Sequence, residues 1–270
     1  MDEAELLFTD LLKCDRMSLY QNKDTILDKD KGRLAASVLK RRSEGEPLQH
    51  ILGKSDFFGF EFKVTPDVLI PRPETEILVE AAIGYIRKEQ TQETTLDILE
   101  LGTGSGCIAV SLAKSLQGIY ITATDISGKA LAVARENVFL SKVSESITLL
   151  QSDLFYLCNR AYDVIISNPP YIPSSEIEKL QPEIQFEPRI ALDGGSDGLH
   201  FYRRIISEGA HYLKSGGLLL LEIGLGELEG VKNIFSGSRE FQILHVVIDH
   251  NKIDRVIVAK RTGEYGQASN

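Results

Sequence analysis

The sequence is poor in the residues that mark several large classes of protein. It has no tryptophan and only 2 methionines, and its 3 cysteines, Cys14, Cys107 and Cys158, stand far apart without a C-x-x-C pair. This spacing indicates neither a disulfide framework nor a zinc site, and it fits a reducing cytoplasm. The 5 histidines show no ligand spacing either, so no metal site is expected.

Long apolar runs and net positive charge are missing as well. No stretch approaches the length of a membrane span, and the start Met-Asp-Glu-Ala-Glu is acidic where a signal peptide needs a basic start. The formal net charge of −9 argues against stable binding to nucleic acid, which needs a basic surface. The 270 residues with 43% apolar content are ample for one large and one small domain, and we expect a cytoplasmic monomer without membrane contact.

The patterns divide the chain into three parts. Residues 1–54 carry leucines at helical spacing and predict a small helical domain. In residues 55–73, phenylalanines alternate with polar residues up to Val64, and the turn Thr65-Pro66-Asp67 leads into Val68-Leu69-Ile70, which predicts a β-hairpin linker. A helix that begins near Glu74 opens the third part, residues 74–270.

From Thr95 on, predicted strands alternate with predicted helices, as in a doubly wound α/β sheet. The expected strands lie at about 96–101, 119–124, 147–151, 162–167 and 217–222, and the expected helices at about 107–116, 128–140 and 200–213. Two last strands, at 241–248 and 255–259, are joined by a connection too short for a right-handed crossover, so they must pair antiparallel. We therefore expect a parallel sheet with one reversed strand near its end.

A rigid polar corner follows one of these strands. Asn168-Pro169-Pro170-Tyr171 comes directly after the strand at 162–167, and open α/β sheets bind ligands at the carboxyl ends of their strands. Because prolines fix φ and lack an N–H group, the side-chain oxygen of Asn168 and the carbonyl of Pro169 can accept hydrogen bonds from a substrate –NH2, with Tyr171 stacked on it. By itself the motif fits a simple turn equally well.

A second candidate site lies in the first strand-to-helix turn, Gly102-Thr103-Gly104-Ser105-Gly106. Alternating glycines let a backbone approach a ligand closely, in a G-x-G-x-G pattern that differs from the pyrophosphate-binding fingerprint. Glu100, Asp125 and Asp153 stand at three successive strand ends, where carboxylates suit ribose hydroxyls and an adenine amine. Asp125 or Asp153 alone fits a helix N-cap, but the set with the glycine loop predicts a nucleoside ligand.

Together with the antiparallel final strand, these motifs resemble the S-adenosylmethionine-dependent methyltransferases of the seven-stranded Rossmann-like type, and Asn-Pro-Pro-Tyr resembles those that methylate a planar nitrogen. Three longer stretches resemble the protein-(glutamine-N5) methyltransferases of class 1 peptide chain release factors. They are Gly45-Glu-Pro-Leu-Gln-His-Ile-Leu-Gly53, Ile70-Pro-Arg-Pro-Glu-Thr-Glu76 and Phe186-Glu-Pro-Arg-Ile-Ala-Leu-Asp-Gly-Gly-Ser-Asp-Gly-Leu199. The resemblance covers the chain from the helical N-terminus to the last strand.

The resemblance implies roles for individual residues. S-adenosylmethionine would contact the loop 102–106, Asp125, the Asp153-Leu154 step and Asn168. The substrate glutamine, in the Gly-Gly-Gln motif of a release factor, would be held by residues 168–171, with catalysis by Asn168, Pro169 and Tyr171 and with Arg72 and Glu74 at the substrate site. The N-terminal helical domain would recognise the release factor. Leu154 stands where some members have an aromatic ring, and His50 replaces a common tyrosine.

The chemistry of an amide leaves little for a general base to do. The lone pair of a glutamine nitrogen is delocalised into the carbonyl, so positioning by hydrogen-bond acceptors must supply most of the rate.

Three alternatives remain open at this point. They are glutamine methylation of a ribosomal protein, N-methylation of adenine or guanine in nucleic acid, and cofactor binding without catalysis.

Overall fold

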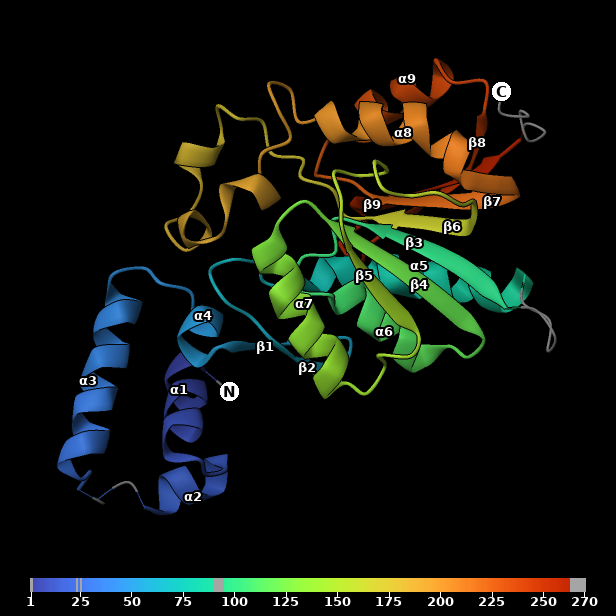
Figure 1. The fold of residues 1–270 in the computed structure, drawn as a ribbon. Coiled ribbons are helices and arrows are strands. Elements are labelled where there is room, and N and C mark those ends of the chain that lie inside the picture. The colour runs from blue at the N-terminus through green and yellow to red at the C-terminus, as the bar shows by residue number, and fades with distance from the viewer. Residues whose placement is uncertain (1, 23, 25, 90–94, 263–270) are drawn as a thin grey trace.

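In the computed structural model, residues 2–22, 24, 26–89 and 95–262 are described, and the N-terminal part of these residues is helical (Figure 1). The helices are α1 (Glu3–Leu12), α2 (Arg16–Gln21), α3 (Lys29–Ser43) and α4 (Leu48–Leu52). Each of the first three helices has an aspartate as its N-cap residue. The side chains of Asp2, Asp15 and Asp28 each accept a backbone N–H group of the first helical turn. Leu7, Val38 and Leu48 form a small core of their own. A separate helical unit is therefore confirmed.

A two-stranded antiparallel hairpin follows, with β1 (Lys54–Phe57) and β2 (Phe60–Lys63). Phe58 and Gly59 form its turn with φ angles of 52° and 76°, and positive φ at both positions is what a type I′ turn requires. The prediction of a hairpin is confirmed, but the predicted turn at 65–67 and second strand at 68–70 are wrong. The chain already reverses at Gly59, and residues 68–70 form no strand.

The large domain alternates strands and helices as predicted. In chain order the elements are α5 (Pro73–Glu89), β3 (Leu96–Leu101), α6 (Cys107–Ser115), β4 (Ile119–Asp125), α7 (Gly128–Leu140), β5 (Ile147–Gln151), β6 (Tyr162–Ser167), three short 3-10 turns (Ile177–Lys179, Ile184–Phe186, Arg189–Ala191), α8 (His200–Tyr212), β7 (Leu213–Glu222), α9 (Leu228–Ser236), β8 (Phe241–Ile248) and β9 (Asp254–Arg261). The helix α9 was not predicted from the sequence.

Seven strands of the described chain form one sheet in the order β5-β4-β3-β6-β7-β9-β8. All neighbours are parallel except β9, which runs antiparallel to both β7 and β8, so the expected reversed strand is confirmed. From β3 the chain passes to β4 and β5 on one side and then returns to β6 on the other. The carboxyl ends of β3 and β6 therefore mark the topological switch point, where ligands bind in open α/β sheets.

Apolar side chains cover the two faces of this sheet with two separate cores. On one face Leu78 of α5 and Ile108 of α6 pack with Ile98 of β3. On the other face Ile205 of α8 and Val231 of α9 pack with strand residues such as Leu219. Figure 1 shows α8 and α9 on one side of the sheet and α5, α6 and α7 on the opposite side. The central strands β3, β6, β7 and β9 are thus largely buried on both faces, which explains their apolar composition.

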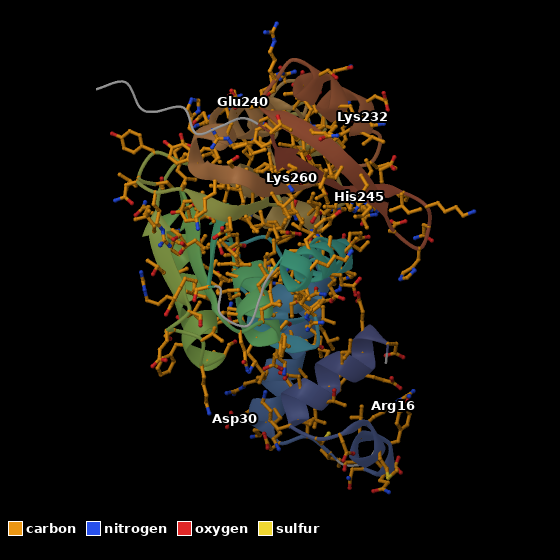
Figure 2. All side chains as sticks on the ribbon, turned by 90° about the vertical axis from the view of Figure 1, so that its right-hand side faces the viewer. Arg16, Asp30, Lys232, Glu240, His245 and Lys260 are labelled. Atoms are coloured by element: carbon orange, nitrogen blue, oxygen red, sulfur yellow. The ribbon has the colours of Figure 1, made fainter. Side chains whose placement is uncertain are left out.

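The N-terminal helices and the strands β8 and β9 lie at opposite ends of the molecule. In Figure 2, Arg16 and Asp30 mark the helical end, and Lys232 and Glu240 mark the other end. An ion pair of 3.1 Å between Arg42 of α3 and Glu183 of the 177–191 segment connects the helical unit to the large domain. Among the described residues, no helix combines the length and apolar content that a membrane span requires.

Candidate active site

Most of the predicted site residues line one cavity of about 190 Å³ at the switch point of the sheet. Its wall contains Gly102, Gly104, Asp125, Asp153, Leu154, Asn168, Pro169 and Pro170. The two motifs that the sequence placed at separate strand ends therefore meet at a single site. Seven other predicted residues do not line this cavity, namely Glu100, Thr103, Ser105, Gly106, Tyr171, Arg72 and Glu74.

The glycine loop forms an open cradle along the cavity. Gly102 and Gly104 have φ angles of 72° and 55°, and no atom lies within 4 Å of the position that a Cβ would take at either residue. At Gly106 a Cβ would stand 3.3 Å from the Cβ of Ala134, so this glycine allows α6 and α7 to approach closely. The carboxamide of Asn137 donates to the Ser105 carbonyl at 2.8 Å and fixes the loop, which the sequence alone did not reveal.

Asp125, at the end of β4, holds the glycine loop in place. Its two carboxylate oxygens accept backbone N–H groups from Gly104 at 2.9 Å and from Ser127 at 2.8 Å. Burial raises the pKa of this carboxyl, while the backbone hydrogen bonds oppose the shift. A carboxylate oxygen has two lone pairs, so each oxygen keeps acceptor capacity for a hydroxyl group in the cavity.

Another part of the cavity wall, around Asp153, combines a carboxylate with apolar side chains. Arg204 of α8 donates to Asp153 at 2.9 Å, a pairing that the sequence did not suggest. Leu154, with a φ of 48°, is buried and reaches both the cavity and the apolar core under α8. Ile126 and Phe201 also line the cavity. Flat apolar surface beside acceptors suits a nucleobase.

Glu100 lies outside the cavity. Its side chain is fully buried, and one oxygen accepts the hydroxyl of Thr103 at 2.8 Å. Burial raises the pKa of Glu100 to about 8, so the carboxyl is largely neutral at pH 7. Thr103 and Ser105 are buried too. The hydrogen bond between Glu100 and Thr103 ties the loop to the end of β3, and a direct cofactor contact of these three residues stays a prediction.

The polar corner at Asn168 is tied to the first turn of α5. The side-chain NH2 of Asn168 donates to the hydroxyl of Thr75 at 3.1 Å, and both residues lie next to the buried Glu222 at the end of β7. Burial raises the pKa of Glu222 to about 7, against the effect of hydrogen bonds from Thr75 and Asn168 and of the positive charge on Arg255. Thr75 lies within the 70–76 motif, but sequence reasoning assigned no role to it or to Glu222, because the contacts join distant parts of the chain.

Tyr171 packs away from the cavity. A Cβ at Gly224 would stand 2.8 Å from its ring, and one at Gly194 would stand 2.7 Å from its backbone. Burial raises the pKa of Tyr171 to about 12. The predicted stacking of this ring on a substrate amide stays a prediction, since Tyr171 does not line the cavity.

Arg72 and Glu74 lie in an ionic layer beside this corner. Arg72 forms an ion pair with Glu187, whose other oxygen accepts the backbone N–H of Ile70 at 3.1 Å. Two of the long motifs, at 70–76 and 186–199, therefore meet in space. Glu74 lies 4.0 Å from Arg255. Arg72 and Glu74, the two predicted substrate residues, thus pair with Glu187 and Arg255, and neither of them lines the cavity.

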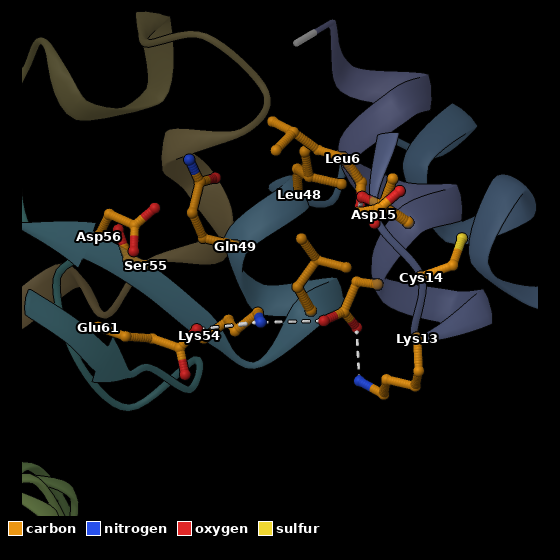
Figure 3. A pocket seen from close by; sticks show the side chains of 13 residues that line it. Leu6, Lys13, Cys14, Asp15, Leu48, Gln49, Lys54, Ser55, Asp56 and Glu61 are labelled. Atoms are coloured by element: carbon orange, nitrogen blue, oxygen red, sulfur yellow. Dashed lines mark hydrogen bonds and ion pairs between the residues drawn. The ribbon is translucent and has the colours of Figure 1, made fainter. Parts of the chain in front are cut away.

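A second, larger hollow of about 760 Å³ lies between α1, α4 and the hairpin (Figure 3). Leu6, Leu48 and Leu52 supply its apolar part, and Asp10 bonds Lys54 at 3.0 Å within it. The residues of this hollow include none of the predicted site residues. Within the described chain, no cluster of histidine, cysteine, aspartate and glutamate side chains forms a metal site.

Comparison with known proteins relates this chain to methyltransferases. A family model described as the methyltransferase small domain matches residues 83–184, and one described as the PrmC N-terminal domain matches residues 1–53. The solved structure of a methyltransferase from Pyrococcus furiosus superposes with a TM-score of 0.55 and 16% identity, over 86% of this chain and 98% of that one. At this identity the likeness concerns the fold alone.

Two curated relatives are much more similar. The release factor glutamine methyltransferase of Geobacter sulfurreducens is 43% identical over 257 residues, which cover 94% of this chain and 87% of that protein. The protein of the same name from Thermodesulfovibrio yellowstonii is 40% identical over 262 residues, with 96% and 92% covered. Both alignments span the helical unit, the hairpin and the large domain together.

Proposed function

Because this chain belongs to the family of release factor glutamine methyltransferases, we propose that it methylates the side-chain N5 nitrogen of a glutamine in a class 1 peptide chain release factor. Its methyl donor is S-adenosylmethionine. One observation carries the proposal above all. The glycine loop with Asp125 and the corner at Asn168 border the same cavity, so a nucleoside site and an amide site are adjacent.

The residues of the cavity fit the methyl donor. The open space over Gly102 and Gly104 receives part of the donor, Asp125 accepts the ribose hydroxyls, and the apolar surface near Leu154 faces the adenine. When bound, the donor supplies an electrophilic methyl group on a sulfonium and leaves as a neutral thioether. The chain therefore needs no acid for the leaving group.

Asn168 and Pro169 act on the substrate amide. Their oxygens accept the two N–H bonds of the glutamine –NH2 and aim its nitrogen into the cavity, and these hydrogen bonds strengthen as positive charge develops on that nitrogen. Pro169 and Pro170 keep the acceptors in place, since their φ angles are fixed. The nitrogen gains a methyl group and loses one proton to solvent.

The helical unit provides surface for the protein partner. The hollow between α1, α4 and the hairpin offers apolar side chains within a rim of Asp10, Lys54 and Glu61 (Figure 3). Mixed apolar and charged surfaces of this kind are typical of protein interfaces. We infer that residues 1–54 bind the folded release factor and present its glutamine to the cavity. We also propose that the enzyme acts as a monomer.

Asp125→Ala should weaken the binding of S-adenosylmethionine by about ten- to a hundredfold, because a hydrogen bond to a charged group is worth about 1.5–3 kcal/mol. Asp125→Asn should weaken binding as well, because its NH2 group would face one of the two backbone N–H groups, of Gly104 or Ser127, that the carboxylate accepts. Isothermal titration with S-adenosylmethionine measures both affinities. Unchanged affinity in the alanine variant would remove Asp125 from the donor site.

The substrate is tested by methyl transfer from labelled S-adenosylmethionine to purified class 1 release factor, followed by mass spectrometry of the labelled peptide. We expect one methyl group on the glutamine of the Gly-Gly-Gln motif, and no label on a release factor in which that glutamine is replaced by alanine. Ribosomal protein and duplex DNA serve as competing substrates. Label on either of these and none on the release factor would refute the proposal.

A further inference from the structure

Asn168 is backed by two buried polar residues that do not touch the cavity. Thr75, in the first turn of α5, is 3% exposed, and Glu222, at the end of β7, is 2% exposed. The hydroxyl of Thr75 accepts the NH2 of Asn168 at 3.1 Å, and Glu222 interacts with both side chains. Uncompensated burial of a carboxylate is costly, so this arrangement calls for a reason beyond packing.

The two ends of a carboxamide have nearly the same shape and differ only in hydrogen bonding. Neighbours therefore decide which end of Asn168 faces the cavity. A carboxylate is an acceptor only, so an ionised Glu222 takes hydrogen bonds from the hydroxyl of Thr75 and from the NH2 of Asn168. The hydroxyl that donates to Glu222 is then free to accept from Asn168 as well. Both contacts draw the NH2 inward and turn the oxygen toward the cavity.

On this basis we propose that Thr75 and Glu222 are positioning residues that hold the side-chain oxygen of Asn168 toward the substrate amide. The inference rests on the proposed function, since only an –NH2 substrate needs an acceptor there. With the carboxamide reversed, two donors would face each other and the substrate would lose one of its hydrogen bonds. Thr75 and Glu222 thus act through Asn168 and do not touch the reacting atoms.

The arrangement depends on the charge of Glu222. The titratable and charged groups that face it from the surrounding elements are Glu74 of α5, Cys107 of α6, Tyr171 after β6, Tyr202 of α8 and Arg255 of β9. Arg255 lowers the pKa of Glu222, Glu74 raises it, and burial brings it to about 7. A protonated Glu222 can donate to Thr75, which then donates to the oxygen of Asn168 and reverses the carboxamide. Activity should therefore rise with pH through about 7.

Paired substitutions at Thr75 test the hydrogen-bond chain. Thr75→Val removes the hydroxyl at nearly constant volume and should lower kcat about ten- to a hundredfold, with the affinity for S-adenosylmethionine within about twofold of the original. Thr75→Ser keeps the hydroxyl and should restore most of kcat. As a matched control, Thr122→Val removes another buried threonine hydroxyl, on β4, and should leave kcat unchanged.

Glu222→Gln tests the charge. Glutamine can donate to Thr75 at every pH, so the variant should have a lower kcat at pH 8 and should lose the rise in activity through about pH 7. Full kcat in Thr75→Val, or the same pH profile in Glu222→Gln, would overturn the inference. If Glu222→Gln does not fold, the comparison of valine with serine at position 75 decides. Failure of the unmodified enzyme to methylate the release factor would instead refute the proposed function.

Discussion

Replacing Asn168 by alanine should lower kcat for methyl transfer by about two to three orders of magnitude, the usual effect of removing one preorganised partner of a developing charge. The alanine lacks the oxygen that accepts the substrate N–H, and the hydroxyl of Thr75 loses its donor at the same time. Single-turnover transfer from labelled S-adenosylmethionine to the release factor measures the chemical step directly, apart from product release.

The same variant should keep its fold and most of its donor affinity, because Asp125 and the glycine loop are unchanged. A few-fold loss of affinity is consistent with the position of Asn168 in the cavity wall. Asn159→Ala provides a matched control, since this asparagine is exposed before β6. An alanine variant at position 168 with an unimpaired single-turnover rate would show that the corner does not position the substrate.

Local sequence signals were enough to place the two motifs of the site. The glycine loop and Asn168 each follow a short apolar strand, and the strands β3 and β6 are neighbours in the sheet. Because parallel strands bring their carboxyl ends to one edge, motifs far apart in sequence could be joined without a structure. The antiparallel pairing of β8 with β9 followed from the short connection in the same way.

The hairpin and α9 show where local signals compete. Gly59 continues the apolar-polar alternation, so it resembled a strand residue, yet its φ of 76° makes it the turn. In α9, Gly230 weakened the helical pattern. A Cβ there would stand 2.8 Å from the end of the Leu199 side chain, just before α8, so the glycine allows α9 to pack closely there despite its low helix propensity.

The supporting residues of the site could not be found from the sequence. Thr75 is 93 positions from Asn168 in the chain, and Arg204 is 51 positions from Asp153. Threonine in a first helical turn and arginine on an amphipathic helix are ordinary choices for those places, so neither residue stands out by itself. Only the tertiary contacts separate them from many similar residues that have no role at the site.

Gly194→Ala should greatly reduce methyl transfer, because residue 194 packs directly against the backbone of the corner at residues 168–171. Its N–H donates to the carbonyl of Ile172 at 2.8 Å, and a Cβ would stand 2.7 Å from the backbone of Tyr171 and from the carbonyl of Gly198. Overpacking of this kind typically costs about 1–3 kcal/mol, and here the backbone that must shift follows Pro170 directly. We expect a lower melting temperature. We also expect kcat to fall about a hundredfold, since a misplacement of the substrate by about 1 Å typically slows a reaction by that factor.

Gly84→Ala is the matched control for this change. Gly84 lies on an exposed face of α5, and no atom is within 4 Å of the position of its Cβ, so alanine should stabilise the helix by about 0.5–1 kcal/mol without loss of activity. Thermal unfolding and donor affinity, measured beside kcat, separate the two effects of Gly194→Ala. If the variant binds S-adenosylmethionine normally and transfers slowly, the glycine keeps the corner in register with the donor. If it transfers at the full rate despite a lower melting temperature, the position of the corner is not set by the 192–195 segment.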